Sequence, residues 1–260
     1  MLAYGIVGLF GGLHSSSWGA YKDTPNEEFK LTKFLRSVAV GLVLGMLLFH
    51  FLKLNDIHSP NPGLFFLFVI AFERLYTESL KSFIRVENQD KYHIIQTFNW
   101  LGTTVNSKFR RLGMGVVYIS LAFMWLYLPV PFDFDLPKIL LGLIWGTVGG
   151  LGVAICGGWK DAPIEGFEST KFLRSPFVGA IWGMIFSFFT TDYSLLLFAC
   201  IGAERMTVEF YKTFILRRHG KFSATVPLFP EWLEKRKRFI YPYALTWAVF
   251  FALLIVFQIN

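Results

Sequence analysis

The chain has 260 residues, of which 54% are hydrophobic and only 17% charged, and its mean hydropathy is +0.48. A soluble domain usually carries about 25% charged residues, so this composition argues against a soluble enzyme and favours an integral membrane protein. The net charge of +7 comes from basic residues spread through short loops. No RNA- or DNA-binding motif accompanies them, so we expect no nucleic-acid partner.

Apolar stretches of about 20 residues recur along the chain, and this length crosses a hydrocarbon core of about 30 Å. They predict an all-α integral membrane protein with eight transmembrane helices. The expected spans are residues 2–21, 34–52, 63–85, 112–131, 138–158, 172–191, 193–216 and 239–259. The first of them is long enough to cross the membrane and has no basic flank, so we expect no cleavable signal peptide.

Two segments of the chain repeat. Residues 22–37 read KDTPNEEFKLTKFLRS and residues 160–175, 138 positions later, read KDAPIEGFESTKFLRS. A second match, 131 positions apart, relates the charged residues of 73–83 to those of 204–214. Self-similarity in the same order predicts an internal duplication. The two predicted four-helix repeats are residues 1–131 and 138–260.

The number of spans and the distribution of charge predict the topology. Four spans per repeat make the repeats parallel, related by a pseudo-twofold axis along the membrane normal. Of the 25 Lys and Arg residues, all except Lys53 and Lys138 lie on the side of the connections that follow the odd-numbered spans. Basic residues stay in the cytoplasm, so we expect a multi-pass protein with both termini on the non-cytoplasmic side.

Small residues recur every four positions in the first two spans of each repeat. They are Gly8, Gly12, Ser37, Gly41 and Gly45, and, 138 positions later, Gly146, Gly150, Ser175, Gly179 and Gly183. Small residues on one face let two helix backbones approach closely in a membrane. The first two spans of each repeat are therefore expected to form a tight pair.

The third and seventh spans carry charges at membrane depth. Glu73 and Arg74 follow the apolar run 64–72, and Glu204 and Arg205 follow the equivalent run. An ionised group there costs at least about 2.5–3.5 kcal/mol, so these side chains should face the protein interior, a partner or water. We expect a cation from another helix to pair with each glutamate, with Arg36 and Arg174 as candidates.

Nine charged positions are retained in both copies, and they are the predicted substrate-binding residues. They are Lys22, Asp23, Glu27, Lys33, Arg36, Glu73, Arg74, Glu78 and Lys81, and in the second copy Lys160, Asp161, Glu165, Lys171, Arg174, Glu204, Arg205, Glu209 and Lys212. In the third span, Arg74, Glu78 and Lys81 share one helix face. Two interpretations stay open: a polar site open to the cytoplasm, or a structural network of salt bridges.

The loop after the first span has two interpretations as well. Asp23 could cap a short interfacial helix with Pro25 in its first turn. Alternatively, the cations of the loop could bind a phosphate or carboxylate. Cys156 and Cys200 fall within spans and are expected to be buried. The segment His14–Ser17 lacks a nucleophile-elbow motif, which disfavours a hydrolase.

We expect a transport or channel protein for a small polar or ionic solute, anions included, with a charged cytoplasm-facing site built symmetrically from both repeats. A membrane-embedded enzyme acting on a lipid or polyprenyl phosphate and a non-catalytic scaffold subunit of a membrane complex are the alternatives. No catalytic residue, metal ligand or cofactor motif is apparent. The expected partners are the lipid bilayer, with its anionic headgroups, and the solute, while a homo-oligomer or a larger membrane complex stays open.

Overall fold

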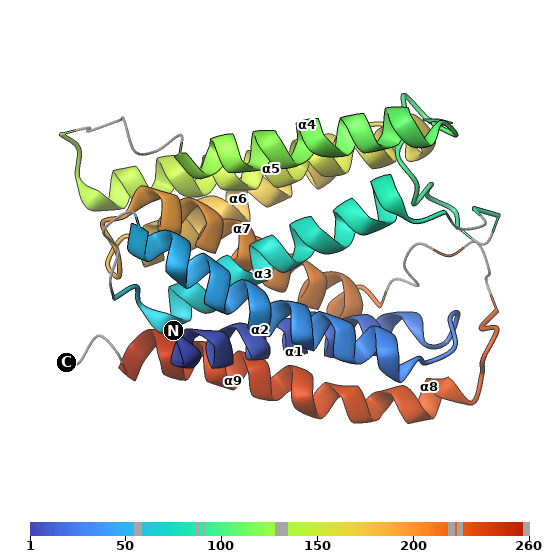
Figure 1. Cartoon of the computed structure of the whole chain (residues 1–260), viewed down its shortest axis with the longest axis horizontal. Helices are drawn as coiled ribbons and strands as arrows, with labels where there is room; N and C mark the ends of the chain where they lie inside the picture. Colours follow the sequence, from blue (N-terminus) through green and yellow to red (C-terminus); the bar gives the residue numbers. More distant parts are fainter. Residues whose placement is uncertain are drawn as a thin grey trace. The chain divides into compact units, whose positions relative to one another are not determined.

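The structure is a computed structural model, and it describes residues 1–54, 59–86, 89–90, 92–127, 135–217, 222 and 226–256. These residues are mainly helical (Figure 1). The helices are α1 (Leu2–Asp23), α2 (Leu31–Leu54), α3 (Pro62–Ser79), α4 (Lys108–Tyr127), α5 (Lys138–Glu165), α6 (Ser169–Phe186), α7 (Tyr193–Phe210), α8 (Trp232–Lys235) and α9 (Ile240–Val256). Shorter elements are the π-helical turns η1 (Leu80–Ile84) and η2 (Tyr211–Ile215), the 3-10 turn η3 (Arg236–Phe239), and the hairpin strands β1 (Asn99–Trp100) and β2 (Thr103–Thr104).

A helix lies at the place of every predicted span, so the all-α class is confirmed. Four helical segments are long and apolar enough to cross a membrane: Leu31–Lys53, Lys108–Tyr127, Lys138–Glu165 and Trp232–Val256. The ends of two predicted spans, 128–131 and 257–259, lie outside the described residues. The crossing of the membrane by all eight helices stays a prediction.

The chain divides into two compact units. Unit 1 consists of Met1–Arg74, Glu209–Gly220 and Ala224–Asn260, and unit 2 of Leu75–Val208 and Lys221–Ser223. Unit 1 therefore contains α1, α2, most of α3 and α9, whereas unit 2 contains α4, α5, α6 and most of α7. Each unit combines helices from both predicted repeats, and the repeat boundaries themselves stay a prediction about the sequence.

The predicted tight pairs are present. In unit 1, a Cβ atom added at Gly8 would overlap the carbonyl oxygen of Gly41, and one added at Gly12 would overlap that of Ser37. In unit 2, the helices α5 and α6 make the same approaches at positions 138 further on, from Gly146 to Gly179 and from Gly150 to Ser175. Helix α9 also packs against α1 in unit 1.

The charged helices α3 and α7 begin with side-chain caps. The Oδ1 atom of Asn61 accepts hydrogen bonds from the backbone N–H groups of Gly63 and Leu64, at 2.9 and 3.2 Å. Asp192, 131 positions further on, accepts one from the N–H of Leu195. Such caps satisfy backbone donors that the first helical turn leaves unpaired. Burial raises the pKa of the Asp192 carboxyl, and the hydrogen bonds from the backbone oppose that rise.

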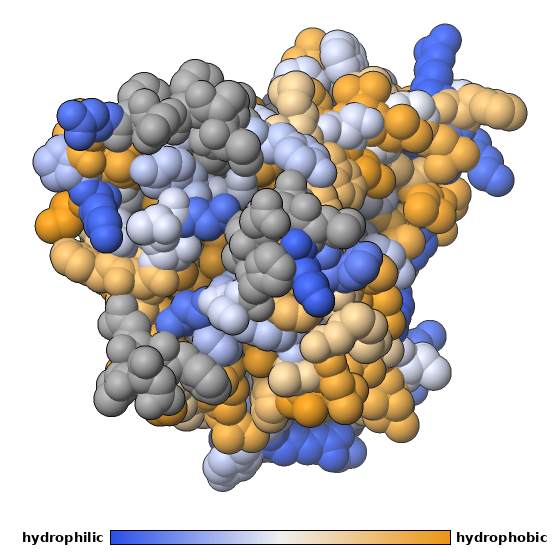
Figure 2. Space-filling model, turned by 60° about the vertical axis from the view of Figure 1, so that its left-hand side comes forward, coloured by the Kyte–Doolittle hydropathy of each residue, from blue (hydrophilic) through white to orange (hydrophobic). Residues whose placement is uncertain are grey.

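Large hydrophobic side chains lie at the surface of several helices, and Figure 2 shows wide apolar areas on the face that it displays. On α4, Val116 is 65% and Met124 is 55% exposed. Soluble monomers rarely expose large contiguous apolar patches. This surface agrees with the membrane-compatible helices.

Candidate functional site

A cluster of charged residues in unit 1 surrounds the indole ring of Trp18. The ring is 7% exposed, and its Nε1–H donates a hydrogen bond of 2.9 Å to the Oγ1 atom of Thr213. The Nζ atom of Lys22 lies 4.4 Å from the ring centre, and the Cζ atom of Arg74 lies 4.9 Å from it. Cations in these positions are attracted by the face of the ring. The indole is therefore buried next to both cations.

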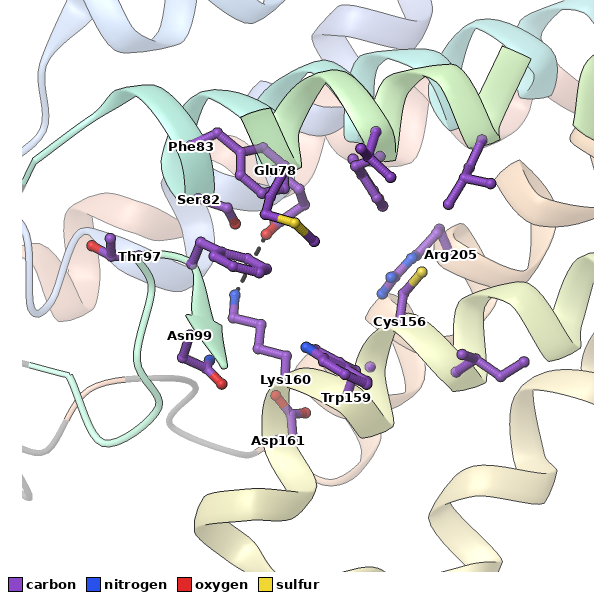
Figure 3. A pocket seen from close by; sticks show the side chains of 17 residues that line it. Glu78, Ser82, Phe83, Thr97, Asn99, Cys156, Trp159, Lys160, Asp161 and Arg205 are labelled. Carbon is purple, nitrogen blue, oxygen red and sulfur yellow. Dashed lines mark hydrogen bonds and ion pairs between the residues drawn. The ribbon is translucent and has the colours of Figure 1, made fainter. Parts of the chain in front are cut away.

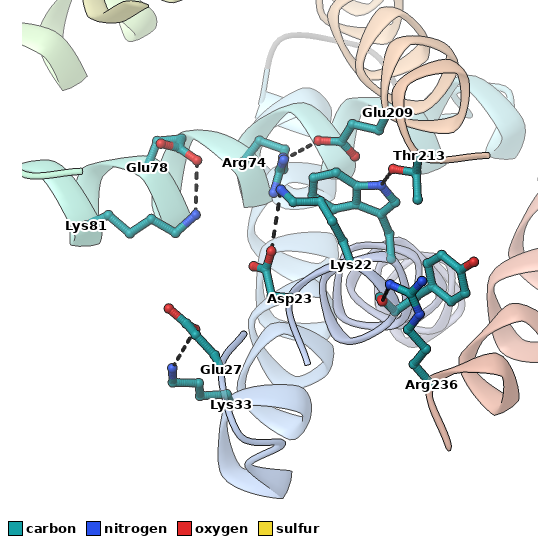
Figure 4. Close-up of polar contacts among 12 residues, drawn as sticks. Lys22, Asp23, Glu27, Lys33, Arg74, Glu78, Lys81, Glu209, Thr213 and Arg236 are labelled. Carbon is teal, nitrogen blue, oxygen red and sulfur yellow. Dashed lines mark hydrogen bonds and ion pairs between the residues drawn. The ribbon is translucent and has the colours of Figure 1, made fainter. Parts of the chain in front are cut away.

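An ion pair closes this cluster. The guanidinium of Arg74 on α3 points toward the carboxylate of Glu209 on α7 and pairs with it (Figure 4). Both side chains are largely buried, at 17% and 9% exposure. Lys22 makes a further ion pair with Asp23, at 3.6 Å. The retained charges of unit 1 thus form a packed network, which fits the structural interpretation of these residues.

Equivalent ion pairs span the connections from α1 to α2 and from α5 to α6. Lys33 lies 3.2 Å from Glu27, and Lys171 lies 2.6 Å from Glu165. The predicted cap by Asp23 is wrong, because α1 ends at Asp23 and no new helix begins there. The backbone carbonyl of Asp23 accepts hydrogen bonds from two residues of the turn, which continues the helical path. In the second copy, α5 runs on through this segment to Glu165.

The two glutamates that the sequence predicts at membrane depth lie in the protein interior: Glu73 and Glu204 are each 1% exposed. Glu204 accepts a hydrogen bond of 2.6 Å from the hydroxyl of Ser175 on α6. Its cationic neighbour is Arg205 of the same helix, at 3.9 Å. The predicted pairing with Arg174 is wrong, because within the described residues Glu204 is hydrogen-bonded to Ser175 and pairs with Arg205. The Arg36–Glu73 pairing stays a prediction.

Unit 2 contains a cavity of about 450 Å³ between the end of α3 with η1, the β1 hairpin, α4, α5 and α7 (Figure 3). Its charged lining residues are Glu78, Lys160, Asp161 and Arg205. Glu78 accepts hydrogen bonds from Lys81 at 3.1 Å, as the spacing on one helix face predicts, and from Lys160 at 3.5 Å. Asp161 lies 3.7 Å from Lys171. Both cavity carboxylates are therefore held by lysines.

Arg205 and Cys156 line the opposite side of the cavity from the pair of Glu78 with Lys160 (Figure 3). The ion pair of Arg205 with Glu204 is long, at 3.9 Å, so its guanidinium can bind a further anion. Cys156 is exposed, whereas Cys200 is buried. The expected burial is thus right for Cys200 and wrong for Cys156, because the cavity reaches the thiol.

Aromatic residues that the sequence interpretation did not select complete the walls. The hairpin turn at Leu101 and Gly102 has positive φ angles of 49° and 85°, typical of a two-residue hairpin. It brings Phe98 and Asn99 to the cavity. The ring of Trp159 also lines the cavity. An Asn-Trp-Leu-Gly-Thr-Thr segment is a hairpin signal that could have been recognised, but its position beside α5 could not.

The remaining predicted site residues lie apart from the cavity. Arg36, Arg174 and Lys212 are half-buried, and none of them lines it. His14, in α1, is buried, and its Nδ1 atom lies 3.0 Å from the hydroxyl of Thr246, which donates to the carbonyl of Tyr243. His14 therefore links α1 to α9 and is not placed as a general base for a serine.

Comparison of the chain with protein-family models, curated proteins and solved structures finds no match. Within the described part of the chain, no group of three or more His, Cys, Asp or Glu side chains is placed to hold a metal ion. The chemistry of the cavity is therefore that of its own side chains: one guanidinium, lysine-paired carboxylates and aromatic walls.

Proposed function

We propose that this protein is a membrane transport protein, a carrier or channel, for a small anionic solute. The single observation that carries the proposal is the cavity of unit 2, in which Arg205 and Lys160 lie among residues of a strongly apolar chain. Ionisable residues inside membrane proteins commonly mark the path of a solute. A volume of about 450 Å³ is in the usual range of small-molecule sites.

The proposal includes the finer architecture expected from the sequence. The chain crosses the membrane eight times as two parallel repeats, with a pseudo-twofold axis along the membrane normal and both termini on the non-cytoplasmic side. The equivalent glycine contacts of α1 with α2 and of α5 with α6 support the duplication. The cluster of basic residues at η3 supports a cytoplasmic position for the start of α9.

Arg205 is assigned to the anion because the other charges of the cavity are engaged. Lysines hold Glu78 and Asp161, at 3.1 and 3.7 Å respectively, so these carboxylates repel an incoming anion less than unpaired ones would. The guanidinium offers several N–H donors in one plane, which suits a carboxylate or phosphate.

Flux measurements test the proposal. The purified chain is reconstituted in liposomes, and efflux of a panel of small anions and cations is recorded for the wild type, Arg205→Met and Lys237→Met. We expect anion flux in the wild type, a loss of about tenfold or more in Arg205→Met, the ratio that corresponds to about 1.4 kcal/mol, and little change in Lys237→Met. Lys237 is a matched control because it lies outside the cavity and is 62% exposed.

If the protein is a scaffold subunit, it should add no ion flux to the liposomes. If every ion leaves wild-type and empty liposomes at the same rate, the transport proposal is wrong. Equal anion flux through wild type and a correctly folded Arg205→Met would remove Arg205 from the path.

A further inference from the structure

Each compact unit has a set of polar residues, and the two sets are related by the internal repeat. In unit 1 these residues pack around an indole ring, whereas in unit 2 they line a cavity. The repeat offsets of 138 and 131 positions relate each polar residue of the Trp18 cluster to a residue that lines the cavity. The equivalent residues, unit 1 before unit 2, are Lys22 and Lys160, Arg74 and Arg205, Glu209 and Glu78, and Thr213 and Ser82. The cavity is thus the counterpart of the packed cluster.

At one further equivalent position the two side chains differ strongly in size. Trp18 corresponds to Cys156, 138 positions later, within an ungapped match that includes the lysine four residues further on. In unit 1 the indole lies beside both cations and is 7% exposed. In unit 2 the thiol of Cys156 is exposed at the wall of a cavity of about 450 Å³. The indole of Trp18 therefore fills a space in unit 1 whose equivalent in unit 2, next to the smaller Cys156, is open.

We infer that the cavity of unit 2 binds a planar aromatic molecule with an anionic group, and that its ring takes the place that the indole of Trp18 fills in unit 1. The inference rests on the proposed function in two respects: the ligand carries an anionic group, and the cavity is the site of the transported solute. Binding itself does not require transport.

The contacts of Trp18 in unit 1 indicate which interactions the equivalent residues of the cavity could make with such a ring. Lys160 and Arg205 supply cations to its faces, as Lys22 and Arg74 do for the indole at 4.4 and 4.9 Å. The hydroxyl of Ser82 can accept a ring N–H, as Thr213 does. The anionic group pairs with the guanidinium of Arg205, whose ion pair with Glu204 is 3.9 Å long.

The walls of the cavity favour a flat, rigid ligand as well. Phe98 packs against Phe83 with ring centres 5.4 Å apart, and Trp159 packs against Trp100 at 5.2 Å. Offset and edge-on contacts of this kind attract a further aromatic ring beyond the area that they bury. A volume of about 450 Å³ suits a fused ring with a short acidic chain and is small for a lipid with two acyl chains.

A binding experiment on the full chain in detergent tests the inference, with indole-3-acetate as the probe and cyclohexylacetate as its non-aromatic counterpart. By titration calorimetry, we expect one molecule of indole-3-acetate per chain and binding of cyclohexylacetate weaker by about tenfold or more, which corresponds to about 1.4 kcal/mol. Cys156→Trp should weaken binding of indole-3-acetate by a similar factor, because the new indole fills the cavity. Cys156→Ala keeps the space open and should bind like the wild type.

Thiol labelling gives a second readout that does not depend on folding of the tryptophan variant. Cys156 is exposed and Cys200 is buried, so a maleimide should modify Cys156 first. Saturating indole-3-acetate should slow this reaction by about tenfold or more, as a ring that occupies the cavity covers the thiol. Unchanged labelling, equal binding of cyclohexylacetate, or undiminished binding by a folded Cys156→Trp would each overturn the inference.

The two proposals fail in different ways. Binding of indole-3-acetate without flux of any ion would leave the aromatic site standing and remove the transport function. Flux of small anions with no binding or labelling protection by indole-3-acetate would do the reverse.

Discussion

The carboxyl group of Glu204 is 1% exposed, a position where an ionised group costs free energy unless hydrogen bonds or cations compensate for lost water. Ser175 donates a hydrogen bond of 2.6 Å to it, and Arg205 lies 3.9 Å away. The same serine takes part in the close approach of α5 and α6, since its carbonyl meets Gly150. One small residue therefore serves packing through its backbone and charge compensation through its side chain.

Replacing Ser175 by Ala should lower the free energy of unfolding by about 1–3 kcal/mol, because a buried carboxylate loses its donor while the helix packing is unchanged. The melting temperature in detergent measures this effect. Thr147→Ala is the control, since the hydroxyl of Thr147 bonds only to a carbonyl of its own helix, at 2.7 Å. Equal melting temperatures for Ser175→Ala and Thr147→Ala would show that the hydrogen bond contributes little.

At the scale of elements, small residues determine which helices pair. In lipid, apolar side chains gain nothing by leaving one apolar environment for another, so close packing holds helices together. The four-residue spacing of glycines in α1 and α5 aligns their backbones with α2 and α6. The other ends of the charged helices α3 and α7 are shaped by the π-helical turns η1 and η2, which carry Ser82 and Thr213.

Substitutions at two glycines of α1 distinguish the effect of helix packing on stability from the effect of helix propensity. Gly12→Ala should destabilise the chain by about 1–3 kcal/mol, since the new Cβ meets the carbonyl of Ser37 on α2. Among the residues that the structure describes, nothing lies within 4 Å of a Cβ atom added at Gly19, so Gly19→Ala should stabilise α1 by up to about 1 kcal/mol through propensity alone. Melting temperatures that shift in the same direction for both variants would contradict a role of Gly12 in the contact.

At the scale of the molecule, each compact unit unites helices that are distant in sequence. Unit 1 combines α1 and α2 with α9, and unit 2 combines α4 with α5, α6 and α7. The chain passes from one unit to the other within α3 and within α7, the two helices that bear the buried glutamates Glu73 and Glu204. The proposed topology assigns the ends of these helices to opposite sides of the membrane.

Cysteines at Ser59 and Asn106 test this topology in a Cys156→Ala, Cys200→Ala background. Both positions are exposed, and Ser59 leaves intact the neighbouring Asn61, which caps α3. An impermeant thiol reagent added to intact cells should label the cysteine at position 59, and the one at 106 only after permeabilisation. The opposite pattern would invert the predicted orientation, and labelling of both in intact cells would contradict a crossing of the membrane between them.

Much of the fold was readable from the sequence, because its signals are local. Length and hydropathy identified the long helices but not α8, and the spacing of Gly8, Gly12, Gly41 and Gly45 identified the tight pair of α1 and α2, since residues four apart share a helix face. The interior position of Glu73 and Glu204 followed from the cost of a charge in hydrocarbon.

Only the tertiary structure decided which residues meet. Glu204 is hydrogen-bonded to Ser175 and not paired with the adjacent Arg174, because neighbouring residues of a helix point about 100° apart and only the packing of α6 decides which of them reaches Glu204. Equal charges in the two copies gave no sign that Trp18 packs into one cluster while Cys156 opens on a cavity in the other. Whether such a space is filled or open depends on the combined volume of side chains from several helices that are distant in sequence. A residue pattern along the chain does not show this combined volume.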